Sequence, residues 1–196
     1  MSNNLGYFFQ IPSTIVNPQL QNMDCQKHLF NLPTDQIYLN CARRGPQTKK
    51  ATALGIASVN RQCDPNSYSI TDFFSLPQQI KVAFADLVAV DDPDRIAIIP
   101  SASYGLANVA NNLNLKKGEK IIVVGEQFPS NMYPWMEVVE KSGGALEIIK
   151  PPTIENRGQN WNEAILTAID DQTKMVALAH VHWADGTLFD LKSIRI

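Results

Sequence analysis

The chain has 196 residues, of which 44% are hydrophobic and 18% charged, and its formal net charge is −2. These values are typical of a globular domain or part of one, and the lack of a clustered basic face argues against nucleic-acid binding. The three cysteines form no Cys-x-x-Cys pair, so we expect neither a zinc ribbon nor a disulfide framework, and a reduced, cytoplasmic setting.

The N-terminal third reads as irregular chain followed by two helices. Residues 1–36 are polar and broken by prolines, and nothing in them resembles a secretory signal or a membrane span. A short strand is expected at 37–39. Pro46 suits the first turn of a helix that reaches about residue 62, and apolar residues at helical spacing predict a second helix over 77–90.

From residue 95 the pattern changes to strands and helices in alternation. Short apolar runs recur every 25–30 residues, as in parallel strands that are buried on both faces. We therefore predict a three-layer α/β/α fold with a mostly parallel sheet over 95–196, preceded by an irregular segment, 1–36, and a helical part, 37–94. The expected strands are 96–99, 121–124, 145–149 and 175–181, and the expected helices are 103–113, 130–142 and 160–169.

Two helix boundaries carry recognisable end signals. Gly143 and Gly144 follow the helix over 130–142, where glycine commonly ends a helix. Asn160 and Glu163 have the spacing of a capping box at the start of the next helix.

Ligands of parallel α/β sheets bind beyond the carboxyl ends of the strands, which directs attention to loops 100–104, 125–131 and 181–187. In the first loop, Ser101, Ala102 and Ser103 open a helix whose free N–H groups could seat a phosphate. The alternative is simple N-capping by a serine. In the second loop, Phe128 could stack on a planar ring or could be an ordinary core aromatic.

The third loop contains two of the three histidines of the chain. Alternation places His180 and His182 on the same face of the last strand. With Asp185 they could bind a metal, or one histidine could hydrogen-bond a cofactor oxygen, or both could be structural. The metal interpretation is weak because the remaining histidine, His28, lies far away in the sequence and zinc sites usually need three or four ligands.

Together these segments resemble the class V aminotransferase superfamily, whose members include kynureninases, isopenicillin N epimerase-like proteins and cysteine desulfurases. Ile37-Tyr-Leu-Asn-Cys-Ala-Arg-Arg-Gly-Pro46 is similar to the entry motif Y-L-(D/N)-x-A-x-x-G-P. Ile98-Ile-Pro-Ser-Ala-Ser-Tyr-Gly105 is similar to the phosphate loop T-x-G-A-T-E, with Tyr104 in place of the acidic residue. Gln127-Phe-Pro-Ser-Asn131 resembles F-P-S-(N/D), and His180-Val-His-Trp-Ala-Asp-Gly186 resembles H-V-x-x-x-x-G.

The resemblance implies the major domain of fold-type I, aspartate aminotransferase-like enzymes, with pyridoxal 5′-phosphate (PLP) as cofactor. Ala102 and Ser103 would then contact the phosphate, Phe128 would stack on the pyridine ring, and His182 would meet the phenolic oxygen. It also implies a homodimer acting on a small amino-acid substrate.

The entry motif would place Asn40 and Arg43 on the substrate side, where an arginine can bind a carboxylate, although Arg43 and Arg44 could equally be solvated surface residues. Desulfurases usually have histidine at the position of Phe128, so the phenylalanine favours the kynureninase-like and epimerase-like branches.

Chemistry with PLP needs a Schiff-base lysine and an acidic partner for the pyridinium nitrogen, and relatives carry both on later strands. No lysine of the chain falls at that place, so we expect a fragment, a cleaved chain or a degenerate relative. Transamination, epimerisation and C–S or C–C lyase chemistry all stay open. Two other classes compete: a metal-dependent hydrolase using His180, His182 and Asp185, and a non-catalytic α/β interaction domain.

Overall fold

The computed structural model describes residues 24–41 and 44–194. The chain divides into two compact units, Met1–Ser69 and Ile70–Ile196. The boundaries expected after residues 36 and 94 do not coincide with this division and stay predictions. Among the described residues, no helix is both long and apolar enough to cross a membrane.

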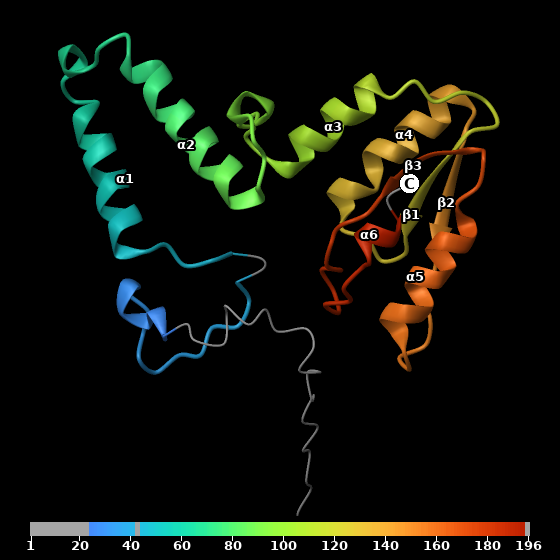
Figure 1. The fold of residues 1–196 in the computed structure, drawn as a ribbon. Coiled ribbons are helices and arrows are strands. Elements are labelled where there is room, and N and C mark those ends of the chain that lie inside the picture. Colours follow the sequence, from blue (N-terminus) through green and yellow to red (C-terminus); the bar gives the residue numbers. More distant parts are fainter. Residues whose placement is uncertain (1–23, 42–43, 195–196) are drawn as a thin grey trace, which may run out of the picture. The chain divides into compact units, whose positions relative to one another are not determined.

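In its described residues the first unit contains one α-helix, α1, which spans Lys49–Arg61 (Figure 1). It begins after Thr48, whose hydroxyl accepts a hydrogen bond from the Ala51 N–H at 3.1 Å. A threonine cap satisfies one of the N–H groups that the first turn leaves free, so the helix begins three residues after Pro46 rather than at it. Two short 3-10 helices, η2 (Gln26–Leu29) and η3 (Pro65–Ser67), flank α1.

The strand expected over 37–39 is not formed. Ile37 and Leu39 are exposed, and this segment has no hydrogen-bonded strand beside it in the described part of the chain. An apolar, extended segment becomes a strand only when a neighbouring strand supplies backbone partners.

The second unit opens with α2, Asp72–Val88, which is followed by the 3-10 helix η4, Pro93–Arg95. The helix begins five residues before Pro77, which therefore lies inside it and removes one backbone hydrogen bond. The carbonyl of Thr71 sets the true start, because it accepts hydrogen bonds from the N–H groups of Phe74 and Ser75 at 3.1 and 2.9 Å.

The sheet of this unit has three parallel strands in the order β2-β1-β3. They span Lys120–Val124 (β1), Ala145–Ile149 (β2) and Thr173–Ala177 (β3). In the central strand, Ile121 to Val124 are fully buried, as expected where helices cover both faces. The parallel sheet is thus confirmed, although β3 ends four residues earlier than predicted.

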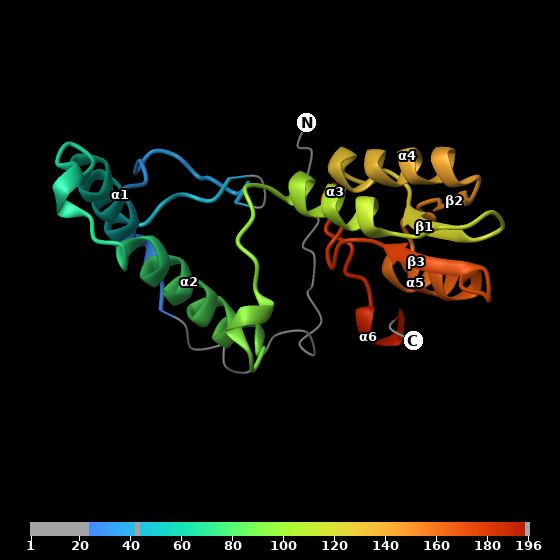
Figure 2. The same ribbon diagram turned by 90° about the horizontal axis from the view of Figure 1, so that it is seen from above.

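Helices cover both faces of this sheet, which confirms the three-layer α/β/α prediction. On one face lie α3 (Ala102–Asn112) and α4 (Tyr133–Ser142), with the short 3-10 helix η5 (Pro129–Asn131) before α4. On the other face lie α5 (Arg157–Ala168) and α6 (Leu191–Ile194) (Figure 2).

Each face of the sheet has a hydrophobic core, which is centred on Trp135 on the side of α4 and on Trp161 on the side of α5. The side chains that form the first core are Ala110, Leu115, Ile121, Val123, Trp135 and Ala177. Those of the second are Val124, Trp161, Ile165, Phe189 and Ile194.

The strand predicted over 96–99 is wrong. This segment is extended, but Ile98 and Ile99 are exposed and no strand pairs with it in the described residues. An apolar run favours a strand only where neighbouring segments bury it and pair with its backbone, and the run itself encodes neither neighbour.

The two predicted helix ends have different outcomes. Gly143 ends α4 in the left-handed conformation, with φ of 71° and its N–H donating to the Val139 carbonyl at 2.9 Å, as predicted. The capping box is wrong, because α5 begins at Arg157 and the Glu163 carboxylate accepts a hydrogen bond from the Gln159 side chain instead.

Candidate functional site

Ser101 and Ser103 at the start of α3 could cap the helix or bind an anion, and the structure gives them different contacts. Ser101 is the N-cap, since its hydroxyl accepts a hydrogen bond from the Tyr104 N–H at 3.1 Å. The N–H groups of Ala102 and Ser103 have no acceptor among the described residues, and both residues are exposed. An anion at this helix end would therefore meet two free N–H groups and the Ser103 hydroxyl.

The extended segment before α3 packs tightly onto this turn. A Cβ atom on Gly105 would lie 2.6 Å from Cδ1 at the end of the half-exposed Ile99 side chain, which would have to shift to make room for it. The side chain of Ile99 therefore packs against the first turn of α3 at Gly105.

Phe128 lies beyond the carboxyl end of β1 and is not a core residue. Its side chain is 51% exposed, and it directly precedes η5, which packs against α3. Asn131 anchors this segment, because its amide group donates to the Ala177 carbonyl at 3.4 Å and accepts from the indole N–H of Trp135 at 3.0 Å. The half-exposed Phe128 ring thus lies in a loop whose next element, η5, contacts α3 and is anchored by Asn131.

The predicted pairing of His180 and His182 on one strand face is wrong. The strand β3 ends at Ala177, and residues 181–188 form a tight hairpin closed by the bridge between Val181 and Leu188. His180 is exposed, whereas His182 is 1% exposed. The earlier end of β3 breaks the alternation on which that prediction depended.

Both ring nitrogens of His182 have partners. Nδ1 lies 3.1 Å from Oδ1 of Asp185, and Nε2 lies 3.3 Å from the carbonyl oxygen of Gly125. The ring also packs against Trp161, with the centroids 5.0 Å apart. Contact with a cofactor oxygen would require His182 to exchange one of these partners, so that role stays a prediction.

Asp185 is the charged centre of the hairpin. Its Oδ2 lies 2.7 Å from Nε of Arg157, and its Oδ1 accepts a hydrogen bond from the Thr187 N–H at 3.0 Å. Burial opposes ionisation of this carboxyl, but the hydrogen bonds from Thr187 and the charges of His182 and Arg157 outweigh it, so its pKa lies below the ordinary value. The carboxylate is therefore engaged in holding the hairpin.

His180, His182 and Asp185 do not form a metal site in this structure. Asp185 is committed to Arg157 and Thr187, and His180 does not share the buried environment of His182. Within residues 24–41 and 44–194, no group of three or more His, Cys, Asp or Glu side chains could hold a metal ion.

The remaining predicted site residues lie in the first unit. Asn40 is exposed, and Arg43 lies outside the described residues. The structure thus brings Ala102, Ser103, Phe128 and His182 into one unit, at the loops that sequence reasoning selected.

One residue at this edge escaped the sequence analysis. Trp183 is exposed, and its indole N–H donates to the carbonyl of Glu126 at 2.8 Å. Its position in the predicted third loop was the only signal in the sequence.

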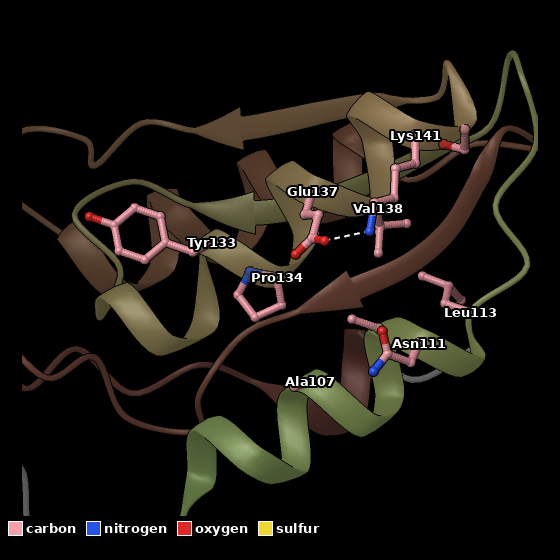
Figure 3. A pocket seen from close by; sticks show the side chains of 10 residues that line it. Ala107, Asn111, Leu113, Tyr133, Pro134, Glu137, Val138 and Lys141 are labelled. Atoms are coloured by element: carbon pink, nitrogen blue, oxygen red, sulfur yellow. Dashed lines mark hydrogen bonds and ion pairs between the residues drawn. The ribbon is translucent and has the colours of Figure 1, made fainter.

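A pocket of about 550 Å³ lies elsewhere, between α3 and α4 (Figure 3). Ala107 and Asn111 line it from α3, and Tyr133, Glu137 and Lys141 line it from α4, where Glu137 and Lys141 form an ion pair. None of the predicted cofactor residues lines this pocket, so the candidate site stays at the carboxyl edge of the sheet.

Comparison with known proteins gives one family. The aminotransferase class-V family profile matches residues 57–196. The uncharacterized aminotransferase YcbU of Bacillus subtilis is 26% identical over 163 residues, which cover 76% of this chain and 42% of that protein. A probable cysteine desulfurase of Methanothermobacter thermautotrophicus is 29% identical over 101 residues, covering 52% of this chain and 24% of that protein.

Solved structures share the fold of this chain. A variant of C-DES with glycine covalently linked to its PLP cofactor superposes with a TM-score of 0.75 at 20% identity, over 87% of this chain and 45% of that one. The cysteine desulfurase CsdA of Escherichia coli superposes with a TM-score of 0.64 at 17% identity, over 91% and 45%. The chain thus spans less than half the length of these relatives.

Proposed function

The chain belongs to the aminotransferase class-V family, and we propose that it forms part of a PLP site that acts at the α-carbon of an amino-acid substrate. The observation that carries the proposal is the pair of N–H groups without acceptors at the start of α3, together with the exposed ring of Phe128 in the loop before η5, a 3-10 helix that contacts α3. A phosphate and a planar ring are the two parts of PLP that such groups can hold.

The phosphate end fits the donors present. Ala102 and Ser103 offer two N–H groups without acceptors among the described residues, and the positive end of the α3 dipole favours an anion. Ser101 is already used as the cap, so the Ser103 hydroxyl is the side-chain donor of this turn.

The ring end fits Phe128. A half-exposed aromatic ring gains favourable apolar burial and stacking when a planar ligand covers it. Bound PLP supplies an electron sink for a bond broken at the α-carbon. The residues of this chain bind the phosphate and cover the ring.

Substrate binding is assigned to the entry motif of the first unit. We propose that Asn40 and Arg43 bind the substrate, whose carboxylate a guanidinium can pair with through two parallel hydrogen bonds. The Schiff-base lysine is proposed to lie outside this chain, and the intact protein is proposed to be a cytoplasmic homodimer.

The branch of the family does not follow from Phe128. Sequence reasoning used this residue to disfavour desulfurases, yet a probable cysteine desulfurase is among the relatives and the superposed structures include a desulfurase. One further structure is described as a cystine C–S lyase in complex with cysteine persulfide. Cysteine and cystine are therefore the first substrates to test with the intact protein.

Neither alternative class gains support from the site. A hydrolase would need His180, His182 and Asp185 around one metal, whereas Asp185 is held by Arg157 and Thr187. A non-catalytic interaction domain would require neither the N–H groups without acceptors at the start of α3 nor an exposed aromatic ring in the loop before η5.

Pyridoxine 5′-phosphate is the probe that tests the proposal, because it lacks the aldehyde and cannot form Schiff bases with surface lysines. Isothermal titration should detect binding to the chain. Ser103→Ala should weaken binding about tenfold, the loss of one hydrogen bond to a charged group, and Phe128→Ala should weaken it about tenfold.

Two exposed residues of α2 provide matched controls. Ser75→Ala and Phe74→Ala remove the same chemical groups from exposed positions and should leave the affinity unchanged. Equal affinities for the parent, Ser103→Ala and Phe128→Ala, or no binding by the parent, would contradict the proposal.

A further inference from the structure

The loop that leads from β1 to Phe128 has a strained backbone, which contacts from another segment of the chain must hold in place. Glu126 adopts a left-handed conformation, with φ of 54°, which costs a residue other than glycine about 1 kcal/mol or more. Packing on Phe128 does not supply the restraint, because that ring is half exposed.

The restraint comes from two consecutive residues of the hairpin. Nε2 of His182 lies 3.3 Å from the carbonyl oxygen of Gly125, and Nε1 of Trp183 donates to the carbonyl of Glu126 at 2.8 Å. The two successive carbonyls that flank the strained residue are therefore both held from the same neighbouring segment.

Trp183 also contacts the ring of Phe128 directly. The two rings meet edge to face, with centroids 5.5 Å apart and an interplanar angle of 86°. Trp183 is itself 58% exposed, so burial of its own surface contributes little. Its contacts instead fix a backbone carbonyl and one side of the Phe128 ring.

We infer that Trp183 is a positioning residue that sets the orientation of the Phe128 ring through the Glu126 carbonyl and the edge-to-face contact. The inference rests on the proposed function, in which Phe128 covers the pyridine ring. It does not place Trp183 in contact with the cofactor. A ring held in one orientation loses less conformational freedom when a ligand stacks on it, so positioning should appear as affinity for the ring and not for the phosphate.

The test separates these two parts with two probes, pyridoxine 5′-phosphate and inorganic phosphate. Trp183→Phe keeps an aromatic edge and removes the N–H donor, whereas Trp183→Ala removes both. We expect the affinity for pyridoxine 5′-phosphate to fall about threefold in Trp183→Phe and about tenfold in Trp183→Ala, which is the range for losing one hydrogen bond and then also an aromatic contact. The affinity for inorganic phosphate should stay within about twofold of the parent, because the N–H groups and the Ser103 hydroxyl at the start of α3 are unchanged.

A second readout needs no ligand. Hydrogen–deuterium exchange of the amides over 125–128 should be faster in both variants, since the loop has lost its outside restraint. Met136→Ala, which truncates an exposed side chain of α4, serves as the control and should leave exchange and both affinities unchanged.

The outcomes distinguish this inference from the proposed function. Unchanged exchange over 125–128 in Trp183→Ala, or equal losses for both probes, would overturn the positioning role. If the parent fails to bind pyridoxine 5′-phosphate while exchange still rises in the variants, the proposed function fails and the restraint of the Phe128 loop stands.

Discussion

The carboxylate of Asp185 lies 2.7 Å from Nε of Arg157, so the hairpin after β3 is tied to the first turn of α5. Arg157 also donates to the Pro152 carbonyl at 2.9 Å, and its guanidinium lies 5.2 Å from the centroid of the Trp161 ring. The hairpin that carries Trp183 is thus bound through Asp185 to α5, the helix on the opposite face of the sheet from α3 and α4.

This ion pair predicts acid sensitivity. The folded pKa of Asp185 lies below its unfolded value, so its contribution to stability is present above the ordinary aspartate range and is lost as the pH falls through the folded pKa. We expect Asp185→Asn to destabilise the fold by about 1 kcal/mol at pH 7 and to lose less stability than the parent between pH 6 and about pH 3. Urea unfolding at several pH values measures this difference, and parallel pH curves for parent and variant would contradict it.

Trp161 is predicted to be the most sensitive position of the second core. It is fully buried, packs against His182 and Phe189, and donates to the Ile149 carbonyl at 3.1 Å. Trp161→Ala should cost about 3–5 kcal/mol, because a large cavity opens. Trp161→Phe should cost less, about 1–3 kcal/mol, because it keeps most of the volume and loses one hydrogen bond to the Ile149 carbonyl, which still accepts from the Gly125 N–H at 2.8 Å. Circular dichroism during urea unfolding should rank the variants in that order.

Substituting the two serines at the start of α3 should have opposite effects: Ser101→Ala should lower stability, and Ser103→Ala should weaken ligand binding. Ser101→Ala removes the cap on the Tyr104 N–H and should lower the free energy of unfolding by about 1 kcal/mol. Ser103→Ala removes an exposed hydroxyl, so it should leave stability within about 0.5 kcal/mol of the parent while weakening pyridoxine 5′-phosphate binding. Thermal melts and titrations of both variants decide this, and the reverse ranking would show that the roles are exchanged.

Sequence periodicity predicted the sheet best where strands are buried on both faces. The apolar run of β1 is visible because Ile121 to Val124 are all enclosed, and β2 was predicted to the residue. The same signal failed at 96–99, where Ile98 and Ile99 are exposed and no strand pairs with the segment in the described residues. It also overextended β3, which ends at Ala177 because the chain turns into the hairpin.

The site was predictable in its loops but not in its contacts. Phe128 and the α3 turn could be found because their motifs lie at strand ends. The links from Trp183 to Glu126 and from Asp185 to Arg157 join segments far apart in the chain, and no local pattern encodes them. For the same reason the sequence left the burial of His182 open.

Gly144 is predicted to be a steric requirement of the turn between α4 and β2. A Cβ atom there would lie 2.6 Å from Cδ2 of Leu115 and 2.9 Å from the backbone oxygen of Glu119. The backbone oxygen cannot move aside without disturbing the start of β1, so Gly144→Ala should destabilise the second unit by about 1–3 kcal/mol. Tryptophan fluorescence during urea unfolding reports this unit, since all three tryptophans of the chain lie within Ile70–Ile196.

Gly55 provides the matched substitution in the first unit. It lies inside α1, where an added Cβ meets nothing within 4 Å, so Gly55→Ala should stabilise the helix by about 0.5–1 kcal/mol through its better helix propensity. Ellipticity at 222 nm should then persist to higher urea concentration, while the fluorescence transition of the second unit stays in place. A destabilising Gly55→Ala, or a neutral Gly144→Ala, would show that close approach does not decide which glycines this fold requires.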